Sequence, residues 1–378
     1  SDGADRIRAL IVVGANPLRS YADTSAYERA FKALDLLVVV DVAMSETAAV
    51  ADYILAGRSA YESYDTTFWS FNYPDIFFHL RRPLVKPAAE TRENSWIMAS
   101  LAEEMDLLPA IPDSLYQAAK EDRGLFRQEL GRYVEYTPEA MLKLPFVLAK
   151  TLGPVLDSCN LALLWGLIWS APARLKEAMT RVGFPEGDDQ TERVYGAIMD
   201  HPEGIWLGRL DPEKNLEFVS TEDSRIHLRV PELTAWLAGI TPEAEKIALT
   251  PDAAFPLILM AGWHYDYNAN TLMRDPEWNR GRRTGCRAVH PGDAAALELA
   301  DGEIARLTTQ AGEANVVVQI SKLARPGMVL LPQGFGLDFE GKSVGVNVNL
   351  LTAAGHRDRI AGTPYHRRVP CRLEKAPS

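Results

Sequence analysis

The chain has 378 residues, of which 47% are hydrophobic and 24% are charged. This composition is typical of globular proteins and excludes a disordered or fibrous class, and the length predicts two or three domains. The formal net charge of -11 disfavours nucleic acid or an anionic membrane as the partner of the whole chain. Cys159, Cys286 and Cys371 lie far apart without CxxC or Cys/His spacing, which excludes a sequence-local zinc or iron–sulfur motif and argues against a disulfide framework.

The sequence starts with Ser1-Asp2-Gly3 and reaches an apolar strand within a few residues. We therefore expect a fragment, a processed chain or a cloned domain, with a tag remnant as the alternative explanation. No signal peptide is recognised. We expect a cytoplasmic location, and a periplasmic one stays open because an export signal would lie upstream.

Residues 1–110 alternate short apolar segments with a helical pattern. Strands are predicted at 9–13, 36–40 and 53–55, and apolar residues at helical spacing predict a helix over 24–34. Strands that alternate with helices indicate βαβ units and a parallel sheet. This region is expected to be a partial Rossmann-like α/β domain.

Polar residues follow the first two of these strands. Gly14-Ala-Asn16-Pro17 comes after the first strand, and Asp41 ends the second. Ligands of parallel sheets bind beyond the carboxyl ends of the strands, so Asn16 and Asp41 are candidates to face a nucleotide. The GxGxxG fingerprint is absent, so NAD is not indicated. The alternative is that Asn16 caps a turn and Asp41 caps a helix.

Residues 111–250 form a helix-rich connecting region in this interpretation. The apolar run Leu161–Trp169 has about half of the ~20 residues that a bilayer-spanning helix needs, so a buried helix is expected rather than a membrane span, with a partner-binding surface as the alternative. Other helical patterns and short strands complete the region; they cover residues 115–133, 138–151 and 171–182 (helices) and 205–207 and 226–230 (strands).

Residues 251–378 are mainly β. Alternating apolar residues predict strands at 304–308, 315–320 and 329–331, and His290-Pro-Gly-Asp begins a short helix. Short strands joined by tight turns and one or two short helices favour a small closed barrel.

This last region opens with an apolar strand that ends at Ala261-Gly262 and continues into a polar loop, Trp263 to Arg274. A polar loop after a buried strand is a common way to hold a ligand, and an ordinary surface loop is the alternative. Arginines cluster twice here, which suggests an anionic ligand such as a pyrophosphate, or else a solvated face or subunit contact. The clusters are Arg274, Arg280, Arg282, Arg283 and Arg287, and Arg357, Arg359, Arg367, Arg368 and Arg372.

Five blocks in order carry a resemblance to a known family. They are Leu10–Pro17, Val39–Leu55 with its Glu46-Thr-Ala48, Leu259–Arg274, His290–Val329 with its Asp301-Gly-Glu303 and Arg325-Pro-Gly, and Asn347–Tyr365. Together they resemble the C-terminal part of the molybdopterin oxidoreductases, the family of DMSO reductase, formate dehydrogenase and nitrate reductase.

The resemblance implies a fold and a cofactor. Residues 251–378 would be a double-psi β-barrel that binds molybdopterin dinucleotide, and residues 1–110 would be half of a Rossmann-like domain that upstream chain completes. The cofactor would be molybdopterin guanine dinucleotide, normally two copies around one molybdenum or tungsten. Its implied contacts form two groups: Gly14, Asn16, Pro17, Asp41 and Thr47 near a guanosine end, and Gly262, Trp263, His264, Asn270, Thr271, Arg274, Gln333, Asn349 and Tyr365 near the pterin and diphosphate.

The sequence departs from the family pattern at three points. Trp263 stands where the family often has arginine, and Ala56 replaces the usual proline. The iron–sulfur cysteines and the metal-ligating residue of the family lie upstream of the first block. We therefore assign no catalytic residue and no metal ligand, and we expect an upstream half or a partner subunit to bring both the metal ligand and the cluster, with electron-transfer subunits beyond it.

Three hypotheses follow. The first is the cofactor-binding portion of a molybdenum or tungsten oxidoreductase that is inactive as this chain alone. The second is a non-catalytic structural or assembly subunit of a redox complex with the same fold. The third is a different nucleotide-dependent α/β enzyme that uses Asn16 and Asp41.

Overall fold

The computed structural model describes residues 6–66, 75–209, 212–250, 252–262, 274–279, 286–358 and 360–377. The chain divides into two compact units, and each is described by itself. Unit 1 combines residues 1–54 with 229–378, and unit 2 comprises residues 55–228. The two ends of the sequence therefore fold together.

A three-stranded sheet opens unit 1. Its order is β1 (Ala9–Val13), β2 (Leu36–Asp41) and β3 (Tyr53–Ala56), and β1 pairs with β2 in parallel, from Ala9 opposite Leu36 to Val13 opposite Val40. The parallel arrangement confirms the α/β prediction for this region. Three short helices accompany the sheet: α1 (Pro17–Ser20), α2 (Thr24–Lys32) and the 3-10 helix η1 (Ala48–Val50).

The core of this sheet lies on one face. Val12, Leu37, Val39 and Ala48 are buried there, and Phe31 packs against them. The β1 side chains alternate between the two faces, because successive residues of a strand point in opposite directions. One face of the sheet is therefore the apolar surface on which the helical segments rest.

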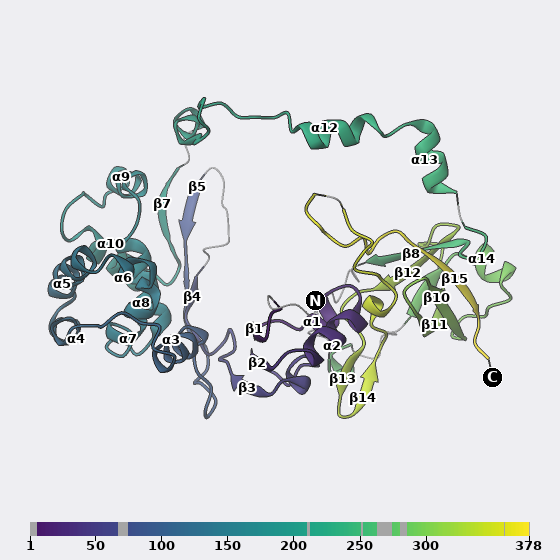
Figure 1. The fold of residues 1–378 in the computed structure, drawn as a ribbon, viewed down its shortest axis with the longest axis horizontal. Helices are drawn as coiled ribbons and strands as arrows, with labels where there is room; N and C mark the ends of the chain where they lie inside the picture. The colour runs from purple at the N-terminus through teal and green to yellow at the C-terminus, as the bar shows by residue number, and fades with distance from the viewer. Residues whose placement is uncertain are drawn as a thin grey trace. The chain divides into compact units, whose positions relative to one another are not determined.

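The larger part of unit 1 is a closed six-stranded barrel, as the alternating pattern predicted (Figure 1). The order around it is β10-β11-β9-β12-β8-β15. Its strands are β8 (Leu257–Gly262), β9 (Cys286–Val289), β10 (Ile304–Thr309), β11 (Glu313–Ile320), β12 (Met328–Pro332) and β15 (Val369–Lys375).

Two of the six barrel pairings are parallel. β8 runs parallel to β12, and β9 runs parallel to β11, whereas the other neighbours are antiparallel. Alternate residues fill the interior, as Leu259, Leu307, Val329 and Leu373 show with exposures of at most 1%. Further elements of unit 1 are α12 (Pro231–Ala238), α13 (Pro242–Leu249), η3 (Pro276–Asn279), α14 (Pro291–Ala296), β13 (Leu337–Phe339), β14 (Lys342–Val344) and η4 (Val348–Leu350).

Unit 2 is mostly helical. At its centre α8 (Cys159–Trp169) buries Trp165 completely, and the Trp165 ring meets the edge of Phe126 at 5.4 Å between centroids. The predicted buried helix is thus confirmed. The other helices are α3 (Asn94–Glu104), α4 (Asp113–Glu121), α5 (Arg123–Tyr136), α6 (Pro138–Leu142), α7 (Leu144–Thr151), α9 (Ala173–Arg181), α10 (Gln190–Asp200), α11 (Pro212–Asn215) and η2 (Leu216–Phe218).

Two short antiparallel ladders complete unit 2. β4 (Asp65–Thr66) pairs with β6 (Leu80–Arg81), and β5 (Asp75–Phe78) pairs with β7 (Ile205–Arg209). The strand predicted at 226–230 is wrong, because these residues form irregular backbone before α12. Within the described ranges, no helix combines the length and apolar character needed to cross a membrane.

Candidate functional site

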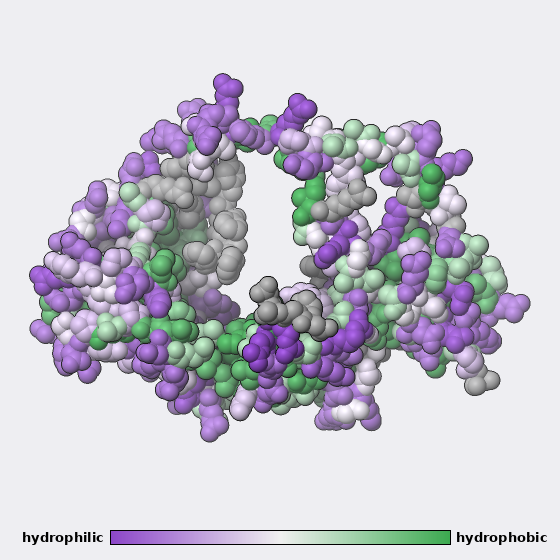
Figure 2. Space-filling view, in the orientation of Figure 1, coloured by the Kyte–Doolittle hydropathy of each residue, from purple (hydrophilic) through white to green (hydrophobic). Residues whose placement is uncertain are grey.

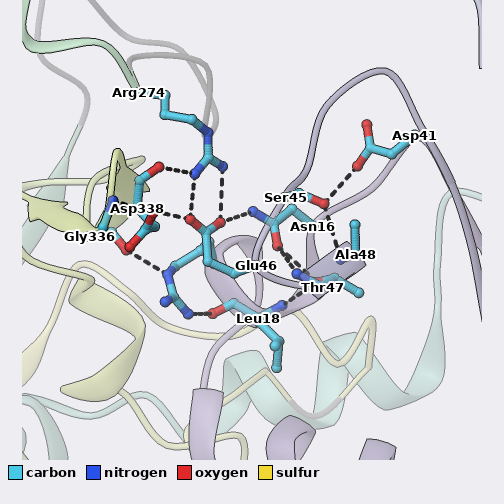
Figure 3. Close-up of polar contacts among 12 residues, drawn as sticks. Asn16, Leu18, Asp41, Ser45, Glu46, Thr47, Ala48, Arg274, Gly336 and Asp338 are labelled. Carbon is cyan, nitrogen blue, oxygen red and sulfur yellow. Dashed lines mark hydrogen bonds and ion pairs between the residues drawn. The ribbon is translucent and has the colours of Figure 1, made fainter. Parts of the chain in front are cut away.

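The turn after β1 is tied to the segment after β2. Gly14 adopts a φ of +57°, and its N–H donates to Val40 O at 2.8 Å. Asn16 is 5% exposed; its Nδ2 donates to Glu46 Oε2 at 2.7 Å, and its Oδ1 accepts from Thr47 Oγ1 at 2.8 Å (Figure 3). Pro17 then starts α1. Asn16 therefore joins the ends of two neighbouring strands rather than only capping a local turn.

Glu46 lies at the centre of this network. Its Oε1 accepts from Arg274 Nη1 at 2.6 Å and from the Asp338 N–H at 2.7 Å. Its Oε2 accepts from Asn16 Nδ2 at 2.7 Å and from Arg274 Nη2 at 3.1 Å. Each carboxylate oxygen thus meets two donors, and Arg274 binds both oxygens through its two terminal nitrogens (Figure 3).

These contacts determine the charge state of Glu46. Burial alone raises the pKa of the carboxyl, but hydrogen bonds from Arg274, the Asp338 N–H and Asn16 outweigh it and lower the pKa from 4.5 to about 2. Hydrogen bonds to the charged form favour that form. Glu46 is therefore a buried, permanently ionised group at neutral pH, and it compensates the charge of Arg274.

Asp41 lies at the carboxyl end of β2 and is half-buried. Its carboxylate accepts from Ser45 Oγ at 2.8 Å and from the Val42 N–H at 2.7 Å. The Ser45 hydroxyl oxygen in turn accepts from the Ala48 N–H at 3.3 Å. Asp41 thus orders the loop that carries Glu46 and Thr47, while its side chain keeps access to solvent.

A second polar cluster joins η4 to α1 and α2. Asn349 has an exposure of 0%, and its Nδ2 donates to Arg19 O at 2.7 Å. Asn347 Nδ2 donates to Thr24 Oγ1 at 2.9 Å. The Asp23 N–H donates to Asn349 O at 3.1 Å. The side-chain amide of Asn349 is therefore directed at backbone within unit 1.

A cavity of about 330 Å³ lies where the parallel strands β8 and β12 end. Its walls are Ala261, Gln333 and the segment from Thr363 to Arg368. The Gln333 N–H donates to Gly262 O at 2.8 Å, which fixes the two strand ends together. The cavity brings together Gln333 and Tyr365, two of the residues that the resemblance implies near the pterin and diphosphate.

The cavity wall is mostly apolar in area, and it includes Gln333, His366 and two arginines, Arg367 and Arg368. His366 Nδ1 is buried and has no hydrogen-bond partner within the described part of the chain. Burial, and then the neighbouring Arg367, lower the pKa of His366, so its ring is neutral at pH 7. A buried polar atom without a partner costs free energy, which a ligand that supplies a hydrogen bond would recover. Together with Arg367 and Arg368, this nitrogen suits a ligand that has polar and anionic groups beside an apolar surface.

The structure thus distributes the predicted residues over three places. Asn16, Asp41, Thr47 and Arg274 belong to the network, with Gly14 and Pro17 beside Asn16 in the turn after β1; Asn349 belongs to the second cluster, and Gly262, Gln333 and Tyr365 to the strand ends and cavity. Trp263, His264, Asn270 and Thr271 lie outside the described residues, as do Arg280, Arg282, Arg283 and Arg359 and the side chains of Cys286 and Arg287. In the remainder, no three His, Cys, Asp or Glu side chains gather as a metal site.

Sequence reasoning did not select Glu46, Asp338 or His366. Glu46 belongs to one of the motifs of the resemblance. It was not selected because an acidic residue is not expected beside a phosphate, and its pairing with Arg274 was therefore not predicted. Asp338 contributes through its backbone, which no sequence pattern distinguishes. His366 follows Tyr365 directly, and its importance comes from burial.

The chain matches two family models. Residues 257–370 match the molydopterin dinucleotide binding domain, and residues 3–104 match molybdopterin oxidoreductase. These are the two regions on which the resemblance rested.

Similar proteins extend over most of the chain. It is 22% identical to a trimethylamine-N-oxide reductase of Haemophilus influenzae over 351 residues, 88% of this chain and 36% of that protein. It is 22% identical to a probable oxidoreductase of Bacillus subtilis, YoaE, over 90% of this chain and 41% of that protein. It is also 35% identical over 104 residues to the alpha subunit of an F420-dependent formate dehydrogenase of Methanocaldococcus jannaschii, 28% of this chain and 15% of that subunit.

A solved structure shares the fold. Acetylene hydratase from Pelobacter acetylenicus superposes with a TM-score of 0.63 at 18% identity, covering 98% of this chain and 44% of that protein. The chain therefore spans less than half the length of each of these four relatives.

Proposed function

Because the chain belongs to the molybdopterin oxidoreductase family, we propose that it is the portion of a molybdenum or tungsten oxidoreductase that binds molybdopterin guanine dinucleotide. The observation that carries this proposal is the cavity at the ends of β8 and β12, whose wall brings Gln333, Tyr365 and His366 together with two arginines. The parent enzyme would carry out two-electron redox chemistry at the metal.

The barrel is proposed to be of the double-psi type. Its two parallel pairs, β8 with β12 and β9 with β11, are separated by antiparallel neighbours. A closed barrel that contains two parallel crossovers supports this assignment. It also leaves the carboxyl ends of β8 and β12 side by side, which is where a ligand loop is best supported.

The residues of the cavity fit the proposed cofactor. Gln333 and the neutral His366 would exchange hydrogen bonds with a pterin edge, and Arg367 and Arg368 would meet the diphosphate. The cofactor supplies the metal-centred redox chemistry when bound, and this chain's residues bind and orient it. Gly14, Asn16, Pro17, Asp41 and Thr47 remain the predicted contacts of a guanosine end.

The metal ligand and the iron–sulfur cluster are proposed to come from an upstream half or a separate subunit, with electron-transfer subunits beyond it. One face of the β1–β3 sheet supports this part. Ile11 and Val13 on that face are each 40% exposed and Leu36 is 36% exposed, and Figure 2 shows hydrophobic residues at the surface in this region. Parallel sheets are normally covered on both faces, so a covering segment is expected here.

Elemental analysis and nucleotide release test the proposal. Protein purified from its natural host should contain molybdenum or tungsten and should release guanine nucleotide when it is denatured. Protein that contains neither would contradict the proposal. If metal and nucleotide are absent while a stable complex with redox subunits persists, the chain is a structural or assembly subunit instead.

A further inference from the structure

We propose that Glu46 is a positioning residue that holds Arg274 in place. In this arrangement Arg274 supports the cofactor site and does not bind the cofactor's diphosphate. This inference rests on the proposed function of the barrel and assigns a role to a residue that was not among the predicted contacts. It concerns only unit 1, to which all four segments of the network belong.

Three of the five N–H donors of Arg274 are engaged by described residues of the chain. Nη1 donates to Glu46 Oε1 at 2.6 Å and also to Asp338 O, and Nη2 donates to Glu46 Oε2 at 3.1 Å. The side chain of Glu46 is 8% exposed and that of Arg274 is 21% exposed. The pair is thus well shielded from water. Two opposite charges attract each other more strongly in such a shielded place than at the surface.

The charge of the pair argues against a diphosphate at Arg274. Glu46 neutralises the guanidinium, and an incoming phosphate would lie close to a buried carboxylate. Like charges in a shielded site repel each other strongly. An arginine that binds phosphate is expected to present an uncompensated fork, which Arg274 does not do.

The location of the pair gives it a positioning role. Arg274 is the last residue of the predicted pterin-facing loop, Trp263 to Arg274. Glu46 attaches it to the turn after β1 through Asn16 and to β13 through the Asp338 N–H. Removal of this attachment would free Arg274 from the turn after β1 and from β13.

The four donors around Glu46 also explain why a carboxylate is needed at this position. Both oxygens of Glu46 face two donors each. A glutamine in its place has one oxygen and one NH₂ group. Whichever way this amide is turned, its NH₂ group faces two donors, so buried donors are left without an acceptor. Glu46→Gln is therefore a nearly isosteric variant that should break the attachment.

The two roles of Arg274 predict opposite results for Glu46→Gln. If Glu46 positions Arg274, native protein carrying this variant should bind the guanine nucleotide about tenfold more weakly, which corresponds to about 1.4 kcal/mol, and should therefore retain less of it per chain after extended dialysis. Arg274→Gln should cause a similar loss, and the double variant should lose no more than the worse single variant. If Arg274 binds the diphosphate, Glu46→Gln should retain as much nucleotide as wild type or more, and this result would overturn the inference.

A more exposed ion pair in the barrel provides the control. Arg306 Nη2 donates to Glu374 Oε1 at 2.9 Å, and both side chains are about one-third exposed. Glu374→Gln should leave nucleotide retention unchanged. If Glu374→Gln and Glu46→Gln lost equal amounts of nucleotide, the loss would reflect general destabilisation of the protein. That result would also refute the inference.

Hydrogen exchange separates this inference from the proposed function. In Glu46→Gln, backbone amides of residues 16, 18–20 and 336–340 should exchange faster, whereas those of β10 and β11 should not change. This readout needs no cofactor, so it reports on the attachment even if the wild-type protein carries no nucleotide. Unchanged exchange at 16, 18–20 and 336–340 would contradict the inference.

Discussion

At the residue scale, Glu46 couples the stability of unit 1 to pH. Its folded pKa of about 2 lies below the ordinary value of 4.5, so its contribution is complete above about pH 4.5 and is lost as the pH falls toward 2. The difference corresponds to roughly 3 kcal/mol. In urea unfolding at pH 7, Glu46→Gln should be destabilised by about this amount, and the gap to wild type should narrow at pH 3. A gap that stays constant with pH would show that ionisation of Glu46 does not contribute.

Two cysteines should be chemically inert in the folded protein. Burial raises the pKa of Cys371 to about 12. Burial, and then the nearby Glu93 carboxylate, raise the pKa of Cys159 to about 11. Because the thiolate is the reactive form, iodoacetamide at pH 8 should modify neither residue until the protein is denatured. Peptide mass mapping checks this site by site, and alkylation of Cys371 in folded protein would contradict it.

Sequence reasoning identified several residues of the network but not their contacts. Asn16, Thr47 and Arg274 were selected from local motifs, yet Arg274 finds Glu46 across 228 positions and Asp338 finds it across 292. No local pattern encodes pairs at such separation. The predicted cofactor contacts therefore remain predictions, while the side-chain partners come from the fold alone.

At the element scale, the turn before β13 depends on a glycine. Gly336 has a φ of +80°, and a Cβ there would lie 2.4 Å from Asn347 N and 2.5 Å from Asn347 Cβ. Gly341 has a similar φ of +75° but has no atom within 4 Å of such a Cβ. Gly341→Ala should cost about 1 kcal/mol from backbone strain alone, and Gly336→Ala clearly more, about 3 kcal/mol, because Asn347 must also shift. Chemical denaturation measures both, and equal costs would contradict the close approach.

The periodicity of apolar residues predicted where most helices and strands lie, but not where each one ends or which strand it pairs with. The strands β1, β2, β10, β11 and β12 follow the predicted segments closely. The helix predicted over 115–133 is instead two helices, because the Asp122 side chain accepts from the Leu125 N–H at 3.0 Å and starts a new one. Residues 226–230 alternate like a strand but have no strand partner among the described residues. Pairing partners are a tertiary property that periodicity does not contain.

At the scale of the whole molecule, the two units have separate hydrophobic cores. The core of unit 2 contains Leu130 and Trp165, and the barrel core of unit 1 contains Leu307 and Leu259. None of the described core clusters combines residues from both units. The sequence predicted a barrel and a helix-rich region. Only the structure shows that residues 229–250 belong to the same unit as the N-terminal segment.

Separate cores predict that damage to one stays local. Leu130 and Leu307 are both fully buried, at 0% exposure, so Leu130→Ala and Leu307→Ala should each cost about 2–5 kcal/mol. In hydrogen exchange under native conditions, Leu130→Ala should accelerate the slowest amides of α5 and α8 while those of β10 and β15 keep their wild-type rates, and Leu307→Ala should do the reverse. Each variant is the control for the other, since both remove the same atoms from an equally buried site. Acceleration in both units by either substitution would mean that the two cores unfold as one cooperative structure, and the cofactor-binding barrel would then depend directly on the helical unit for its stability.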